Sequence, residues 1–187
     1  MSTVTLPRAR SVAVNLVAFQ VCWVFSVMAA GAGAPWIGPA VIVCWLTLHL
    51  SLASDVPKRE VQLCVLAAVV GWIADSLLVF AGVMTFPHHA QLGAPSTLWM
   101  AALWAGFAAT VPHSLGWLHQ RLCLAAVLGA VAGPLAYFGG ERLGAIELAS
   151  SKALLAVSVV YALLTPALMW VWRRMGIRPL APSALTC

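Results

Sequence analysis

The amino-acid sequence predicts an all-α membrane protein, a polytopic bundle of six transmembrane helices with both termini in the cytoplasm. Of the 187 residues, 63% are hydrophobic and only 8% are charged, whereas a soluble domain carries roughly 25% charged residues. The apolar residues form long continuous runs, and basic residues flank those runs at alternate ends. These three observations exclude an attached soluble catalytic domain, so residues 1–187 are expected to form a single integral membrane domain.

Six apolar runs are long enough to cross a bilayer, which takes roughly 20 residues of helix. They cover about 12–30, 36–54, 61–83, 97–118, 121–139 and 150–172. Each should be helical, because a segment in lipid must satisfy its backbone hydrogen bonds internally. The segment DVPKRE at 55–60 is expected to be a break between runs. Pro134 and the pair Gly139-Gly140 are expected to kink or end the fifth helix.

The distribution of lysine and arginine supplies the orientation, since cytoplasmic loops hold an excess of basic residues. With the N-terminus inside, the cytoplasmic side receives Arg8, Arg10, Lys58, Arg59, Arg121, Arg173, Arg174 and Arg178, and the outside receives only Arg142 and Lys152. This asymmetry predicts a multi-pass protein of six spans with both termini in the cytoplasm. The formal charge of +5 is then explained by the basic residues that set the orientation in the membrane. These residues form no basic patch, so no nucleic-acid partner is expected. The expected partners are membrane lipids, and either a second copy of the chain or another membrane protein.

Asp75 is the residue that most clearly indicates a functional site. It lies inside the third apolar run, in GWIADSLLVFAG, where a carboxylate costs about 2.5 to 3.5 kcal/mol on insertion scales. Gly71, Leu78 and Gly82 share its helix face at spacings of three and four, and small residues on that face let another helix approach. We therefore expect Asp75 to face other helices and to bind a ligand or a proton there.

Five further polar residues are candidate ligand-binding groups. His49 and His113 are expected near the cytoplasmic ends of the second and fourth runs, and Tyr137, Glu141 and Arg142 near the outer end of the fifth. Arg142 is the natural partner for a carboxylate on another span. One structural alternative is that His113 only satisfies carbonyl groups freed by Pro112. Another is that Glu141 and Arg142, which are adjacent and do not face each other, pair elsewhere in an outer-leaflet salt bridge that fixes the helix end.

Tyr137 also closes a second stripe of small residues. Ala125, Gly129, Gly133 and Tyr137 recur at four-residue spacing, which predicts a close helix contact with a hydroxyl at its end.

Motifs for known chemistry are missing from the sequence. It contains no G-x-S-x-G elbow, no H-E-x-x-H helix and no P-loop. Its five cysteines include no C-x-x-C pair. No cofactor and no metal ion are therefore expected on sequence grounds.

Four segments resemble one family. GPLAYFGGERLGA, NLVAFQVCWVFSV, LWAGFAAT and the third run with its aspartate are similar to small proteobacterial inner-membrane proteins classed only as a domain of unknown function. The resemblance implies a membrane location and a lipid-linked role. It implies no activity and no role for any single residue.

Three functional hypotheses remain at this point. The first is binding or transport of a small cation, a proton or a lipid head group at Asp75, helped by Glu141 and Arg142. The second is an intramembrane enzyme that acts on a lipid or acyl substrate through Tyr137, Glu141 and Arg142. The third is an accessory subunit of a membrane complex, whose polar groups only specify helix packing. A carboxylate without catalytic neighbours favours the first.

Overall fold

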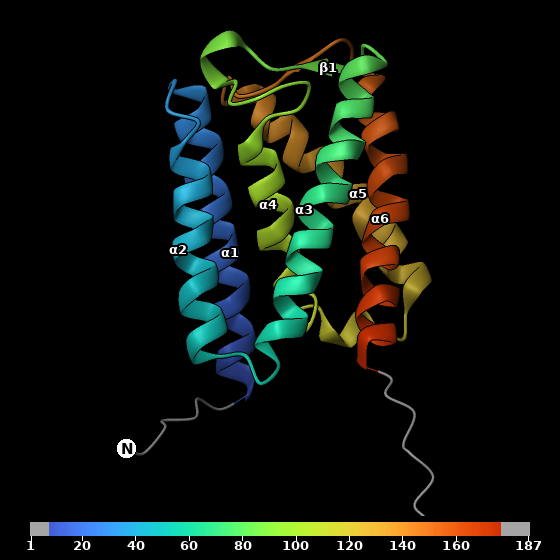
Figure 1. Ribbon diagram of the computed structural model, residues 1–187. Helices are drawn as coiled ribbons and strands as arrows, with labels where there is room; N and C mark the ends of the chain where they lie inside the picture. Colours follow the sequence, from blue (N-terminus) through green and yellow to red (C-terminus); the bar gives the residue numbers. More distant parts are fainter. Residues whose placement is uncertain (1–7, 177–187) are drawn as a thin grey trace, which may run out of the picture.

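The computed structural model describes residues 8–176 as a bundle of helices that run roughly along one direction (Figure 1). The helices are α1 (Arg8–Gly31), α2 (Ile37–Leu52), α3 (Pro57–Phe80), α4 (Leu98–Ala108), α5 (Leu122–Arg142) and α6 (Ala153–Gly176). Two 3₁₀ helices, η1 (His88–Ala90) and η2 (Gly116–Leu118), lie in the connections. Two-residue strands β1 (Met84–Thr85) and β2 (Glu147–Leu148) pair antiparallel and join the loops after α3 and α5. The all-α prediction is confirmed.

Four of these helices are long and apolar enough to cross a membrane, which indicates a membrane protein. They are α3, α5, α6 and the part of α1 from Val12 to Gly31. The helix α2 has 16 residues and α4 has 11, or about 24 and 16 Å at 1.5 Å per residue, against a hydrocarbon core of about 30 Å. The start of α1 and the end of α6 lie at the same end of the bundle (Figure 1).

The predicted helix over 97–118 is wrong in its second half. The helix α4 ends at Ala108, and residues 109–121 continue as turns around η2. Pro112 accounts for this end, because it has no backbone N–H to donate and it restricts Val111 before it. The Thr110 hydroxyl donates to the Phe107 carbonyl at 2.6 Å and closes the last turn. The predicted helix was extended across Pro112 because apolar residues recur as far as Leu118, although Thr110, His113 and Ser114 interrupt them.

This irregular segment, residues 109–121, is packed inside the protein and its freed carbonyl groups have partners. Thr110 is 1% exposed and Val111 is fully buried. The Asn15 amide donates to the Ala109 carbonyl at 3.3 Å, and the His119 ring nitrogen lies 2.8 Å from the Val111 carbonyl. Non-helical backbone at membrane depth is tolerated only with such protein partners. The idea that His113 serves these carbonyls is wrong, since its ring contacts Glu60.

The expected end of the fifth helix at Gly139-Gly140 is also wrong, because α5 continues to Arg142. A Cβ at Gly140 would lie 2.8 Å from Ile146 Cδ1, and one at Gly139 would lie 3.2 Å from Trp23. These glycines therefore make room for neighbouring side chains and leave the helix intact. The helix ends at Arg142, and Gly144 follows its cap with a φ of 73°, in the left-handed region that favours glycine.

Small residues set the helix spacing at two interfaces. Gly71 of α3 faces Trp104 of α4, and Gly133 of α5 faces the ring of Tyr161 on α6. Ala125, Gly129, Gly133 and Tyr137 are all buried along one side of α5, which confirms the predicted stripe.

Gly71→Ala tests the α3–α4 contact. Its Cβ would lie 2.1 Å from Trp104 Cγ, so the indole must shift, at a cost of about 1 to 3 kcal/mol. We expect a lower midpoint of thermal denaturation in detergent, followed by circular dichroism. Gly116→Ala is the matched control, because the nearest atom to its Cβ is His119 Cε1 at 3.9 Å. Equal midpoints for the two variants would contradict this account of the interface.

Candidate functional site

The structure gathers the predicted site residues in three separate places. Asp75 and Tyr137 meet in the middle of the bundle. His49 and His113 meet at the end where α2 turns into α3. Glu141 and Arg142, at the end of α5, join neither group: a Glu141 oxygen accepts the Leu148 N–H at 3.4 Å, and the Arg142 guanidinium lies 5.0 Å from the centre of the Phe138 ring.

The Asp75 carboxyl group is completely enclosed by aromatic side chains. Asp75 is 0% exposed, and the Trp104 indole N–H donates to its Oδ2 at 3.0 Å. The Tyr137 hydroxyl donates to Oδ1. Tyr161 stacks on Trp104 with 4.7 Å between ring centres and meets Tyr137 edge-on at 5.7 Å. Asp75 thus faces other helices, as predicted, and ties α3 to α4 and α5.

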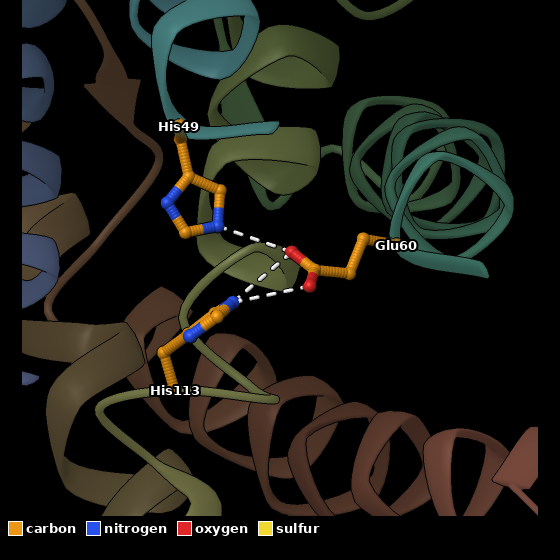
Figure 2. Close-up of side chains that lie close together, drawn as sticks. All are labelled: His49, Glu60 and His113. Atoms are coloured by element: carbon orange, nitrogen blue, oxygen red, sulfur yellow. Dashed lines mark hydrogen bonds and ion pairs between the residues drawn. The ribbon is translucent and has the colours of Figure 1, made fainter. Parts of the chain in front are cut away.

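A second carboxylate, Glu60, lies between the two predicted histidines (Figure 2). His49 Nε2 is 3.0 Å from Glu60 Oε2, and His113 Nε2 is 3.1 Å from both carboxylate oxygens. The Ser54 hydroxyl donates to Oε1 at 2.5 Å. The two imidazole rings meet edge to face, 4.6 Å between centres. We call His49, Glu60 and His113 the His–Glu–His cluster.

Three different segments position this cluster. His49 belongs to the last turn of α2 and Glu60 to the first turn of α3, with the short connection between them. His113 comes from the irregular segment 109–121, one residue after Pro112. Glu60 is 2% exposed, and the His49 and His113 side chains are 5% and 20% exposed. The cluster is therefore buried at one end of the bundle. Of its three side chains, only that of His113 is partly exposed.

Glu60 is the residue that the sequence analysis missed. DVPKRE was expected to be a loop, whereas α3 begins at Pro57 within it. Proline at the start of a helix and an acidic residue in its first turn are both typical of helix N-termini. The signal was also present in the spacing, because Glu60 continues the buried face formed by Cys64, Ala67 and Gly71.

The cluster has the composition of a metal site. One ligand atom from each residue can be chosen so that all three lie within 4.8 Å of one another. Two imidazole nitrogens and a carboxylate oxygen are common ligands of Zn²⁺ and Fe²⁺. The Asp75 group has a different chemistry, because the indole N–H that faces it only donates and has no lone pair to offer.

Fold and clusters together define a helical membrane protein with two buried carboxylate sites. The chain belongs to the family described as protein of unknown function (DUF2878), whose model matches residues 12–167. The resemblance to an uncharacterised family is thereby confirmed. No curated protein and no solved structure matches the chain.

Asp75→Leu tests the enclosed carboxyl group. It leaves the Trp104 N–H and the Tyr137 O–H buried without an acceptor, at a cost of about 1 to 3 kcal/mol each. We expect a clearly lower denaturation midpoint in detergent. Asp75→Asn should lower the midpoint less, because the amide oxygen can still accept the Trp104 N–H and the NH₂ group can donate to the Tyr137 oxygen.

The matched control for this pair is Asp55, which is exposed in the connection between α2 and α3. Asp55→Leu and Asp55→Asn should leave the midpoint close to that of the wild type. An Asp75→Leu protein as stable as the Asp55 variants would show that the two aromatic donors contribute nothing to stability.

Proposed function

We propose that this protein is a metal-binding membrane protein whose His–Glu–His cluster holds one divalent transition-metal ion, with Zn²⁺ as the best fit. One observation carries the proposal: three ligand residues from three segments direct their ligand atoms to one buried point, within 4.8 Å of one another. Zinc lies about 2.0 to 2.1 Å from such atoms, which in a tetrahedral site places the ligand atoms roughly 3.3 Å apart. The separations of 3.0 and 3.1 Å from Glu60 to the two rings are close to that spacing.

The protons of the cluster are consistent with this role. With Glu60 accepting, each Nε2 carries a hydrogen that points at the carboxylate. An ion would take the place of those two hydrogens, and the imidazoles would then be protonated on Nδ1. This change is a tautomer shift that keeps one hydrogen on each ring. Because only a neutral imidazole and an ionised carboxylate offer lone pairs to a metal, ion binding should weaken as the pH falls.

The proposal moves cation binding from Asp75 to the other end of α3. The first hypothesis included transport as well as binding, and transport has no separate support in the structure. An enzyme is the second candidate function, because three protein ligands leave a fourth position open, as in catalytic zinc sites. Whichever applies, the same ion is required.

We also propose that the cluster lies at the cytoplasmic side of an inner membrane. Lys58 and Arg59 follow the start of α3, and Arg173 and Arg174 lie in the last turn of α6. Figure 1 places the start of α3 and the end of α6 at one end of the bundle. A basic end of this kind faces the cytoplasm in most membrane proteins.

Cobalt titration of the chelator-treated protein tests the metal site. The protein should carry no histidine tag, and Co²⁺ absorption in the visible range reports bound metal directly. We expect one equivalent to bind and to be displaced by Zn²⁺. Glu60→Gln and His113→Ala should each lower the affinity at least about 100-fold, since loss of an outer-shell partner alone costs 10- to 100-fold.

His88→Ala and Glu147→Gln are matched controls, because both residues are exposed. They belong to η1 and β2, which lie next to β1 in the chain or pair with it, and β1 is at the opposite end of the bundle from the α2–α3 connection (Figure 1). They should bind like the wild type. In parallel, Zn²⁺ should raise the denaturation midpoint of the wild type and of the controls only, because ligand binding stabilises the folded state. Wild-type binding no tighter than that of Glu60→Gln would overturn the proposal.

Ser54→Ala tests the orientation of the carboxylate. The Ser54 hydroxyl holds Glu60 Oε1 at 2.5 Å, which leaves Oε2 for the ion. Its loss should lower cobalt affinity about 10- to 100-fold while one equivalent still binds. Ser51→Ala, on an exposed position of α2, is the control. Identical affinities for the two alanine variants would show that Ser54 has no part in the site.

A further inference from the structure

An apolar pocket of about 470 Å³ lies between α1, α5, α6 and the irregular segment 109–121. Leu16, Leu128 and Leu135 belong to its lining and are 45%, 40% and 64% exposed. The pocket therefore opens sideways through the outer surface of the bundle, which faces lipid in a membrane protein. This lining would accept many apolar groups, so the charges at the end of the pocket decide which molecule it binds.

The side of α5 that borders the pocket begins with a positive charge. Arg121 is the residue directly before α5 and is exposed. Leu128 and Leu135 follow it at intervals of seven residues, which places all three on one side of the helix. The Arg121 side chain thus belongs to the same side of α5 as the opening of the pocket.

A second arginine reaches the same turn of the chain. The Arg173 Nη1, from the last turn of α6, donates to the His119 carbonyl at 3.2 Å, and the Arg121 N–H donates to the Leu118 carbonyl at 2.8 Å. The Leu118 side chain lines the pocket. Neither arginine forms an ion pair with a carboxylate in the part of the chain that the structure describes. Two positive charges therefore lie beside the pocket without an anion to balance them there.

The two arginines lie at the level expected for lipid head groups. Trp117 in η2 is 55% exposed, and tryptophans of membrane proteins are enriched at that level. Leu128 and Leu135 are about 10 and 21 Å beyond Arg121 along α5. The hydrocarbon of one leaflet is about 15 Å deep, half of the core. An acyl chain that descends from a head group at Arg121 would therefore run along the pocket.

We propose that the pocket and the two arginines bind one anionic phospholipid, with its phosphate at Arg121 and Arg173 and one acyl chain in the pocket. Arginine forms strong, paired hydrogen bonds with phosphate, and Arg173 keeps N–H groups for it because a guanidinium has several donors. Basic sites between membrane helices on the cytoplasmic side hold anionic lipids in this way. The inference goes beyond the metal site and does not depend on it.

Native mass spectrometry of the full chain in detergent tests the proposal, because it counts bound lipids by their mass. The probes are phosphatidylglycerol and the zwitterionic phosphatidylcholine with identical acyl chains. We expect one phosphatidylglycerol to bind at least about fivefold more tightly than phosphatidylcholine, since each basic side chain near anionic lipid contributes about fivefold. Equal affinities for the two lipids would overturn the proposal.

Arg121→Gln and Arg173→Gln test the head-group half of the site. Each should weaken phosphatidylglycerol binding about fivefold and leave phosphatidylcholine binding unchanged. Arg142→Gln is the matched control, because Arg142 is exposed at the other end of α5. Should Arg121→Gln and Arg173→Gln bind phosphatidylglycerol as tightly as Arg142→Gln, the arginines do not hold the phosphate and the proposal is wrong.

Ala132→Phe tests the acyl-chain half. Ala132 lines the pocket and is exposed, so the added ring should fill the pocket and remove the tightly bound phosphatidylglycerol, while the denaturation midpoint shows that the variant is folded. Val131→Phe is the control, since Val131 is exposed outside the lining. A folded Ala132→Phe protein that binds the lipid like Val131→Phe would contradict the proposal.

Free glycerol phosphate distinguishes a lipid site from a site for phosphate alone. At the concentration of the lipid it should displace no phosphatidylglycerol, and displacement would show that the pocket contributes nothing. The metal-site variant Glu60→Gln should bind phosphatidylglycerol like the wild type, so failure of the lipid site is distinguishable from failure of the metal site.

Discussion

Hydrocarbon offers no hydrogen-bond partner, so the polar groups inside this bundle depend on partners from the protein. The two buried carboxyl groups of α3 meet this constraint in different ways. Asp75 takes one hydrogen bond from an indole and one from a phenol. Glu60 takes its partners from two imidazoles and a serine hydroxyl. The first arrangement joins three helices, and the second joins the ends of two helices to an irregular segment.

That irregular segment connects the features of the bundle that are most relevant to function. Because α4 ends at Ala108, the chain from 109 to 121 returns through the protein as turns and carries His113 to Glu60. The same segment lines one side of an apolar pocket that also borders α1, α5 and α6. Asn15 compensates for the lost helix by holding the Ala109 carbonyl and accepting from the Ser114 hydroxyl at 2.7 Å. A single interruption near Pro112 therefore brings His113 to the His–Glu–His cluster and places Leu115 and Leu118 along the pocket.

Hydropathy and small-residue spacing could predict the helices, the burial of Asp75 and the packed face that ends at Tyr137, since each depends on local pattern. They could not predict where α4 ends, because apolar residues continue to Leu118 and a proline such as Pro112 can kink a membrane helix as well as end it. Glu60 was missed for a related reason. Its charged neighbours Lys58 and Arg59 are typical of a loop between membrane spans. The burial of Glu60 depends on His49 and His113, which come from two other segments.

The chemistry of the partners decides which carboxylate suits a cation. Glu60 and Asp75 are 15 residues apart on α3, about 22 Å along the helix. The indole nitrogen at Asp75 has no free lone pair, so Trp104 can donate to the carboxylate but cannot bind a cation beside it. The imidazoles at Glu60 can move their proton to Nδ1 and present Nε2 to a metal. An intramembrane aspartate is thus the more conspicuous group in the sequence, but the glutamate at the helix start has neighbours that can share an ion with it.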